Sequence, residues 1–210
     1  MNVVSTNIAE PATFFWEGRE HRTGIYKYPT EKPIFLDTNA VQGDTIGSPK
    51  VHGGEYKACY LFSAEEYDHW KPLYPSLEWN WGMFGENLTV SGLNEEEIRV
   101  GDLYSVGKCL VEITQPREPC FKLGYRFNDQ EIIAAFVKRG RPGTYARILE
   151  KGEVCQGDEI RLVSRSDNPL TVLQCYRLIY DRVKNKDHLR WALLNESLPP
   201  RFRKNLGRGQ

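Results

Sequence analysis

The sequence predicts a mainly β fold, a barrel or a sandwich with a few short helices, followed by a small C-terminal subdomain of three helices. Up to about residue 165, short stretches of alternating apolar residues are separated by Gly-Asp pairs, which is typical of strands joined by tight turns. After residue 168 the apolar residues follow a helical period instead. The 210 residues are enough for a β domain at 1–165 and a helical subdomain at 166–210.

Three Gly-Asp pairs support the β assignment, and the first of them, at 43–44, is the weakest. The pair at 101–102 separates apolar stretches at 98–100 and 103–106, and the alternation continues through 109–113. The segment 154–162 repeats this arrangement around its own Gly-Asp pair. Strands of this length and spacing favour an antiparallel barrel or sandwich over a parallel sheet.

One helix is predicted inside the β domain and three after it. Ser63 and Glu66 have the spacing of a capping box, in which Glu66 would bind the backbone amide of Ser63, and Pro72 would end that helix. In the tail, a helical stripe begins at Val172, Asp187 is positioned to cap a second helix, and Ser197 precedes two prolines that suit the first turn of a third. The stripe consists of Val172, Tyr176, Ile179 and Val183.

The charge balance argues against a nucleic-acid-binding protein, because 28 basic residues are matched by 28 acidic ones. The distribution is uneven, with nine Lys or Arg against three Asp or Glu from residue 168 onward. This basic tail is a candidate docking surface for an electron-donating partner, carried by Arg201, Arg203 and Lys204. The other interpretation is that these residues only solvate the outer faces of the helices.

The five cysteines form no Cys-x-x-Cys pair and no zinc-type spacing, so reduced thiols are expected. Four of them, at 59, 109, 155 and 175, are expected to be small buried apolar residues. No apolar run resembles a signal peptide or a membrane span, and we expect a soluble cytoplasmic protein with no membrane partner.

Cys120 is the residue that most needs an explanation. It follows Arg117, precedes Lys122, and lies in a segment stiffened by Pro116 and Pro119. Nearby positive charge favours the thiolate, which is the form that binds metals and attacks electrophiles. Two prolines disfavour a helix through 115–120, so Cys120 is predicted to lie on a rigid loop.

The sequence contains no nucleotide-binding motif of its own. The segment 101–108 has five residues between its glycines where a phosphate-binding loop has four, and no Ser or Thr follows its lysine. No Gly-x-Gly-x-x-Gly opens a helix after a strand. If the protein carries out redox chemistry, its electrons are therefore expected to come from an external reductase.

Several segments together resemble the MOSC superfamily, specifically its YiiM-like members. They occur in order along nearly the whole chain, and the helical tail resembles the three-helix C-terminal extension of that group. The matching segments are 24–27, 43–44, 51–54, 82–89, 115–120 and 140–147.

The resemblance implies a MOSC-type β-barrel that binds the molybdenum cofactor, in which a pterin dithiolene holds molybdenum and Cys120 is an additional ligand. It implies a reductase of N-hydroxylated compounds, with purine-like bases as the small-molecule substrates and an external reductase as partner, and it leaves a homodimer open. The expected cofactor-binding residues are Lys27, His52, Asn87, Arg117 and Lys122, with Cys120 as the catalytic residue and metal ligand.

Some roles and classes of function stay open at this point. Asn87 is favoured over Glu86 for the pterin edge, since an amide both donates and accepts hydrogen bonds. Trp79, Trp81 and Phe84 are candidates for stacking on a purine-like substrate, or for the core. The alternative functions are a non-catalytic carrier of the cofactor or of sulfur on Cys120, and a cysteine hydrolase that uses His52 as base.

Overall fold

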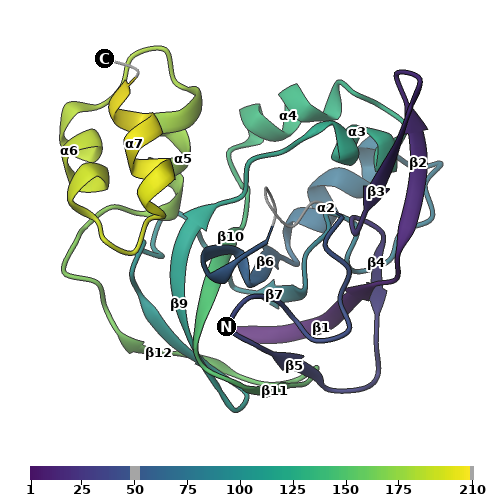
Figure 1. Cartoon of the computed structure of the whole chain (residues 1–210), viewed down its shortest axis with the longest axis horizontal. Helices are drawn as coiled ribbons and strands as arrows, with labels where there is room; N and C mark the ends of the chain where they lie inside the picture. The colour runs from purple at the N-terminus through teal and green to yellow at the C-terminus, as the bar shows by residue number, and fades with distance from the viewer. Residues whose placement is uncertain (48–52, 209–210) are drawn as a thin grey trace.

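An eight-stranded sheet forms the centre of the structure (Figure 1). The computed structural model describes residues 1–47 and 53–208. All neighbouring strands of the sheet run antiparallel except β6 and β7, which are parallel. In sheet order the strands are β12 (Ile160–Ser164), β8 (Leu103–Val106), β9 (Cys109–Pro116), β10 (Thr144–Glu150), β6 (Cys59–Ser63), β7 (Leu88–Ser91), β1 (Asn2–Ala9) and β4 (Lys27–Pro29).

The mainly β prediction is confirmed, but a closed barrel is not. The amide of Val3 donates to the carbonyl of Asp158 at 2.9 Å, and the amide of Ile160 donates to the carbonyl of Met1 at 2.8 Å. The sheet therefore curls until the start of β1 meets the start of β12, but only an isolated bridge between Asn2 and Glu159 joins them, and the sheet stays open. Two separate strand pairs complete the β structure: β5 (Ile34–Leu36) with β11 (Gly152–Val154), and the hairpin of β2 (Ala12–Trp16) and β3 (Arg19–Thr23).

The three Gly-Asp pairs all form turns. Gly43, Gly101 and Gly157 have φ values of 77°, 96° and 89°, a left-handed conformation that side chains disfavour. The aspartate after each glycine accepts backbone hydrogen bonds. Asp102, for example, is fully buried and accepts from the amides of Arg99 and Ser166, each at 2.9 Å. These turns explain why the sequence pattern identified the strands.

Three helices lie within the β-rich part, and the sequence predicted only one of them. The helix α2 (Glu66–Trp70) ends before Pro72 as expected, but the predicted capping box is wrong. Ser63 belongs to β6 and donates to Glu65 at 2.6 Å, while Glu66 binds the guanidinium of Arg139 at 2.8 and 2.9 Å. The helices α3 (Phe121–Phe127) and α4 (Ile132–Arg139) were not predicted.

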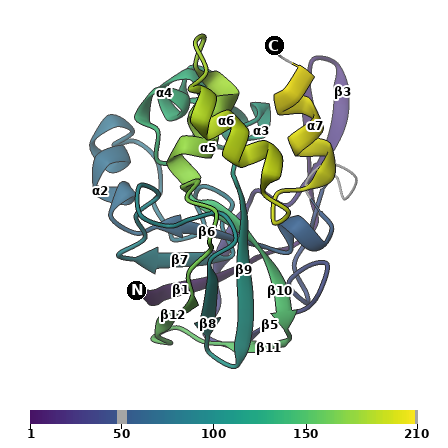
Figure 2. The ribbon, with the colours of Figure 1, turned by 90° about the vertical axis from the view of Figure 1, so that its left-hand side faces the viewer.

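The three tail helices are present as predicted, as α5 (Val172–Tyr180), α6 (Lys186–Leu194) and α7 (Pro200–Arg208). Asn185, and not Asp187, caps α6 by accepting two backbone amides. Val183 lies beyond the end of α5 and is exposed, so the predicted stripe ends early. Figure 2 shows the helices gathered at one end of the sheet, opposite the ends of β8, β9 and β11.

The tail helices share a hydrophobic core with the sheet. Leu178 of α5 and Leu189 of α6 belong to the same buried cluster as Val111 and Ile148. The side chain of Asn195 donates to the carbonyl of Val100 at 3.0 Å. A domain boundary at 165 stays a prediction, because this packing is continuous across it.

A second, aromatic cluster lies under α2, α3 and α4. It includes Phe62, Tyr67, Phe84, Phe127 and Phe136. The rings of Phe62 and Phe84 lie 4.3 Å apart between centroids. The helices α2, α3 and α4 therefore pack against aromatic side chains. None of the helices in the described part of the chain has the length and apolar character needed to cross a membrane.

The shared core predicts that the tail and the sheet unfold together. Leu178→Ala should lower the free energy of unfolding by about 2–5 kcal/mol, because Leu178 is 1% exposed and its removal leaves a cavity. Leu194→Ala is the matched control, since that leucine is 66% exposed, and should change stability by less than about 0.5 kcal/mol. Chemical denaturation followed by circular dichroism measures both. A separate early transition of the helices in Leu178→Ala would contradict the shared core.

Candidate functional site

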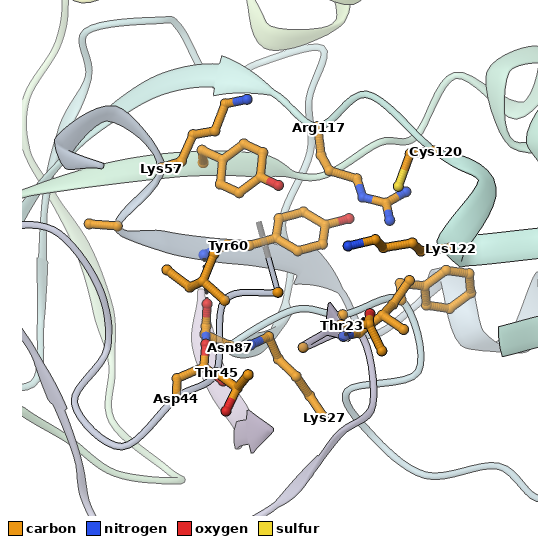
Figure 3. Close-up of a pocket in the computed structure, with 18 of the residues that line it drawn as sticks. Thr23, Lys27, Asp44, Thr45, Lys57, Tyr60, Asn87, Arg117, Cys120 and Lys122 are labelled. Carbon is orange, nitrogen blue, oxygen red and sulfur yellow. Dashed lines mark hydrogen bonds and ion pairs between the residues drawn. The ribbon is translucent and has the colours of Figure 1, made fainter. Parts of the chain in front are cut away.

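Five of the six residues predicted to form the site line one pocket, with an empty volume of about 660 Å³. Figure 3 shows Arg117, Cys120 and Lys122 on one side of it, with Lys27 and Asn87 on another. The sixth predicted residue, His52, lies outside the described residues. Other residues that line the pocket are Asp44, Lys57, Tyr60, Glu118 and Tyr145.

Two loop segments form one wall of the pocket because glycines let their backbones touch. A Cβ atom on Gly24 would lie 1.7 Å from the carbonyl oxygen of Thr45. A Cβ atom on Gly47 would lie 2.4 Å from the Cα atom of Thr23. Only glycine fits at these two positions, so the chain before β4 and the chain after the first Gly-Asp turn are held side by side.

A buried carboxylate, that of Asp44, organises the floor of the pocket. It accepts hydrogen bonds from the Ala9 amide at 2.8 Å and the Asn87 side-chain amide at 2.9 Å, and it forms an ion pair with Lys27. Burial lowers the pKa of Lys27, and the charge of Asp44 opposes that shift. Lys27 is therefore a buried cation that is already paired within the protein.

Asn87 and Glu86 are also fully occupied by protein groups. The Asn87 oxygen accepts from the Tyr60 amide at 3.2 Å, while its nitrogen donates to Asp44. Glu86 is fully buried and accepts from the Tyr67 hydroxyl at 2.5 Å and from the amides of Gly82 and Phe84 at 2.9 and 3.1 Å. Both side chains thus fix the shape of the loop 82–87, and neither has an unused group directed to a pterin.

Arg117 differs from these residues because it is buried and unsatisfied. The residue is 5% exposed, and its Nη1 atom has no hydrogen-bond partner in the described part of the chain. Its guanidinium carbon lies 5.7 Å from the ring centroid of Tyr60 and 5.4 Å from that of Phe136, so two aromatic rings hold the cation. The alternative of a surface salt bridge is wrong. A buried guanidinium without a carboxylate partner is typical of a site for an anionic ligand.

Cys120 lies where the predicted loop ends and α3 begins, and its thiol is free and partly exposed. Lys122, in the first turn of α3, donates to the carbonyl of Arg22 at 2.8 Å. Burial lowers the pKa of Lys122, and the neighbouring Cys120 opposes that shift. Of the other cysteines, Cys59, Cys109 and Cys175 are buried as predicted, whereas Cys155 is partly exposed.

Sequence reasoning missed several residues that line the pocket. The Gly-Asp motif could have identified Asp44, and Tyr145 lies in the matching segment 140–147, but Lys57 and Tyr60 carry no local signal. The ammonium of Lys57 lies 5.6 Å from the ring centroid of Tyr145, and burial lowers the pKa of that lysine while Glu118 opposes the shift. Burial raises the pKa of Tyr145 to about 12, so this phenol is neutral at physiological pH.

Trp79, Trp81 and Phe84 were candidates for stacking on a substrate, and the positions of the two tryptophans do not support that role. Trp79 and Trp81 do not line the pocket, and their rings pack against Tyr67 at centroid distances of 5.8 and 4.5 Å. Phe84 lines the pocket but is fully buried. Phe84 belongs to the buried aromatic cluster, and Trp79 and Trp81 are partly buried and pack against it. Within residues 1–47 and 53–208, no group of three or more His, Cys, Asp or Glu side chains is arranged to hold a metal ion.

Comparison with known proteins identifies relatives of this chain. A family model described as "MOSC domain" matches residues 48–161. The uncharacterized protein YflK of Bacillus subtilis (strain 168) is 34% identical over 202 residues, which is 96% of this chain and 91% of YflK. A protein named "Reductase" from Gibberella moniliformis is 34% identical over 79% of this chain, but the match spans only 30% of the fungal protein. The crystal structure of YiiM from Geobacillus stearothermophilus superposes with a TM-score of 0.82 and 27% identity, and the match covers 99% of this chain and 98% of that one.

The buried ion pair on the pocket floor predicts a pH-dependent defect in Asp44→Asn. Leaving Lys27 buried without its partner should lower the free energy of unfolding by about 3–5 kcal/mol near neutral pH. The pKa of Lys27 is lowered in the folded state. Between that lowered pKa and the pKa of an unperturbed lysine, the unfolded chain therefore binds one proton more than the folded protein. Stability of the variant should therefore rise as pH increases toward about 10.4, the value of an unperturbed lysine. Denaturant titrations between neutral and alkaline pH measure this slope.

The double variant Asp44→Asn with Lys27→Met is the control, because it removes both charges. It should lose the alkaline slope that the single variant shows. Equal slopes in the two variants would assign the pH dependence to another group.

Proposed function

Since the chain belongs to the MOSC domain family, we propose that its pocket binds the molybdenum cofactor and that the protein reduces N-hydroxylated compounds. Cys120 is the proposed protein ligand to molybdenum. The substrates proposed are small N-hydroxylated molecules such as purine-like bases. The matched domain and the fungal relative named "Reductase" support an activity of this general kind.

The observation that carries the proposal is the buried guanidinium of Arg117, whose Nη1 atom has no hydrogen-bond partner among the described residues and which lines the same pocket as Cys120. An unsatisfied buried donor lowers stability by about 1–3 kcal/mol, so a chain that keeps one favours a ligand that supplies the acceptor. The phosphate of the cofactor is such an acceptor, and the planar fork of arginine matches it. Lys57 and Lys122 add positive charge to the same pocket.

The thiol of Cys120 is suited to the metal part of the cofactor. A thiolate is a soft ligand, and it suits a metal that is already bound by dithiolene sulfurs. Among the described residues, no group of three or more His, Cys, Asp or Glu side chains is arranged to hold a metal ion, so the remaining ligands would come from the cofactor itself. When bound, the cofactor supplies two-electron reduction with removal of the substrate's hydroxyl oxygen.

Each residue of the pocket then has a distinct proposed task. Arg117 and Lys122 bind and orient the anionic part of the cofactor. Lys27 and Asn87, whose polar groups are held by Asp44, keep the floor of the pocket rigid. The tyrosines Tyr60 and Tyr145 exclude water from the wall behind Arg117.

Electrons are proposed to come from an external reductase. The chain has no dinucleotide-binding motif, and the named fungal reductase is a longer protein in which the matched region is a minor part. Other parts of the fungal protein could supply the electrons to its matched region. For the present chain, a separate protein would supply them. The basic tail remains the proposed docking surface for it.

A non-catalytic carrier of the cofactor or of sulfur is the competing function. Both functions need Cys120 and Arg117, so binding alone does not separate them. Turnover with an artificial electron donor does. A cysteine hydrolase has no further support, because its proposed base, His52, lies outside the described residues.

The metal-ligand role predicts that Cys120→Ser abolishes turnover while leaving the fold intact, because a hard hydroxyl is a poor substitute for a soft thiolate. The control is Cys155→Ser, which changes the other partly exposed thiol, outside the pocket. Reduction of an N-hydroxylated base by dithionite-reduced protein from a cofactor-producing host measures the effect. Parental rates in Cys120→Ser would remove the cysteine from the chemistry.

The phosphate role predicts that Arg117→Ala weakens retention of the cofactor by about 1.5–3 kcal/mol, the usual value of a charge-assisted hydrogen bond. Arg117→Lys should fall in between, since it keeps the charge and loses the bidentate fork. Molybdenum per protein after extensive dialysis measures retention. The same molybdenum content in all three proteins would exclude Arg117 from the site.

A further inference from the structure

A second cleft lies on the tail helices and shares no lining residue with the pocket that contains Cys120. The loop 181–185, between α5 and α6, forms one side of this cleft, and α6 forms the other. Its empty volume is about 1230 Å³. In Figure 1, α6 is the outermost of the three tail helices, on the side away from α3 and α4, so this end of the molecule is accessible to another protein.

Every charged residue that lines this cleft is a cation. The four are Arg182, Lys184, Lys186 and Arg190, and among the described residues no Asp or Glu lines the cleft. None of the four side chains forms a hydrogen bond or an ion pair with a residue in the described part of the chain. Cations that line one cleft repel one another, and no carboxylate in the cleft offsets that repulsion. The cleft therefore attracts a partner that carries negative charge.

The apolar part of the cleft is one face of α6. Residues 186, 189, 190, 193 and 194 all line the cleft and are spaced three or four positions apart, so cations and leucines share that face. Leu193 and Leu194 are 38% and 66% exposed. Next to the cleft, Val183 in the loop is 87% exposed. Exposed apolar side chains that gather in one place among polar groups are typical of a protein contact.

The fold of the tail does not account for these exposed groups. On the core side, α6 packs through Leu189 and Ala192, and Asn185 caps its first turn. Leu194 does not belong to the core cluster. Solvation of an outer helix face would explain the cations, but it does not explain a leucine exposed between them.

The combination of charge, apolar surface and shape selects the class of partner. A small inorganic anion would satisfy the cations but gain nothing from the leucines. An anionic membrane would gain from both, but a flat lipid surface does not fill a cleft between a loop and a helix. A protein segment that carries carboxylates beside apolar side chains matches the charge, the apolar face and the shape together.

We infer that the cleft between the loop 181–185 and α6 docks a segment of a partner protein in which Asp or Glu residues lie beside leucine-like residues. The inference goes beyond the proposed function, since it needs neither the cofactor nor redox activity. Within the basic tail, it places the protein contact on α6 and the loop before it. Arg201, Arg203 and Lys204 of α7 do not line the cleft.

The first test uses a fluorescein-labelled peptide, Leu-Glu-Glu-Leu-Leu-Glu-Glu-Leu, and two matched peptides in which either all glutamates are glutamine or all leucines are serine. Fluorescence anisotropy with the full chain gives the three dissociation constants. The first peptide should bind most tightly, because only it offers both carboxylates and apolar side chains. If it does not bind, or if the serine peptide binds equally well, the inference is overturned.

The second test locates the bound peptide with variants of exposed residues. Arg190→Gln should weaken binding about two- to fivefold, the range for one exposed charge pair. Leu194→Ser should weaken it about five- to tenfold, because an apolar contact is lost. The controls are Lys204→Gln and Leu149→Ser, which change an exposed cation of α7 and a 44% exposed leucine of β10, both outside the cleft.

The controls should bind the peptide as the wild type does, and circular dichroism should show the same fold in all variants. Equal weakening by Lys204→Gln and Arg190→Gln would mean that only the overall charge of the tail matters, which overturns the inference. So would unchanged affinity in Arg190→Gln and Leu194→Ser, because the peptide would then bind elsewhere. Vesicles of phosphatidylcholine and phosphatidylserine test the membrane alternative. Sedimentation with these vesicles that is lost in Leu194→Ser, together with absence of peptide binding, would assign the cleft to a membrane.

Discussion

The pocket depends on the buried carboxylate of Asp44, which holds together three distant segments of the chain. It binds the end of β1 through the Ala9 amide, the start of β4 through Lys27, and the loop before β7 through Asn87. A buried charge is tolerated only when its hydrogen bonds are satisfied, and here the three partners satisfy it. Glu86 plays the same part within the loop 82–87. Two saturated carboxylates thus give the pocket a rigid floor.

The side of the pocket that contains Arg117 differs from this floor, because a buried polar group there is not satisfied. Arg117 is as buried as Asp44, but one of its nitrogen atoms has no partner among the described residues, and aromatic rings surround it in place of a carboxylate. Saturated groups hold a structure together, whereas an unsatisfied buried group is tolerated where a ligand completes it. This contrast separates the saturated residues that shape the pocket from Arg117, and it supports the proposed ligand-binding role of Arg117.

Local patterns predicted the elements that local physics determines. Alternation and Gly-Asp pairs identified β8, β9 and β12, apolar periodicity identified the tail helices, and two prolines indicated the loop before Cys120. The helix α3 escaped notice because it begins directly after that loop and contains Gly124. The partners of Asn87 and the burial of Lys57 result from strand pairing between distant segments, such as β1 with β7, which no local pattern encodes. The family resemblance brought five pocket residues together, yet it could not separate the saturated amide of Asn87 from the unsatisfied guanidinium of Arg117.

The proposed function requires that Cys120 supplies a sulfur ligand to a molybdenum ion whose cofactor is held by Arg117. X-ray absorption at the molybdenum edge, on protein purified from a host that makes the cofactor, tests it most directly because it reports the atoms bound to the metal. We expect near-stoichiometric molybdenum with a sulfur neighbour that is missing in Cys120→Ser and present in Cys155→Ser. An identical sulfur shell in all three proteins, or protein that never contains molybdenum, would contradict it.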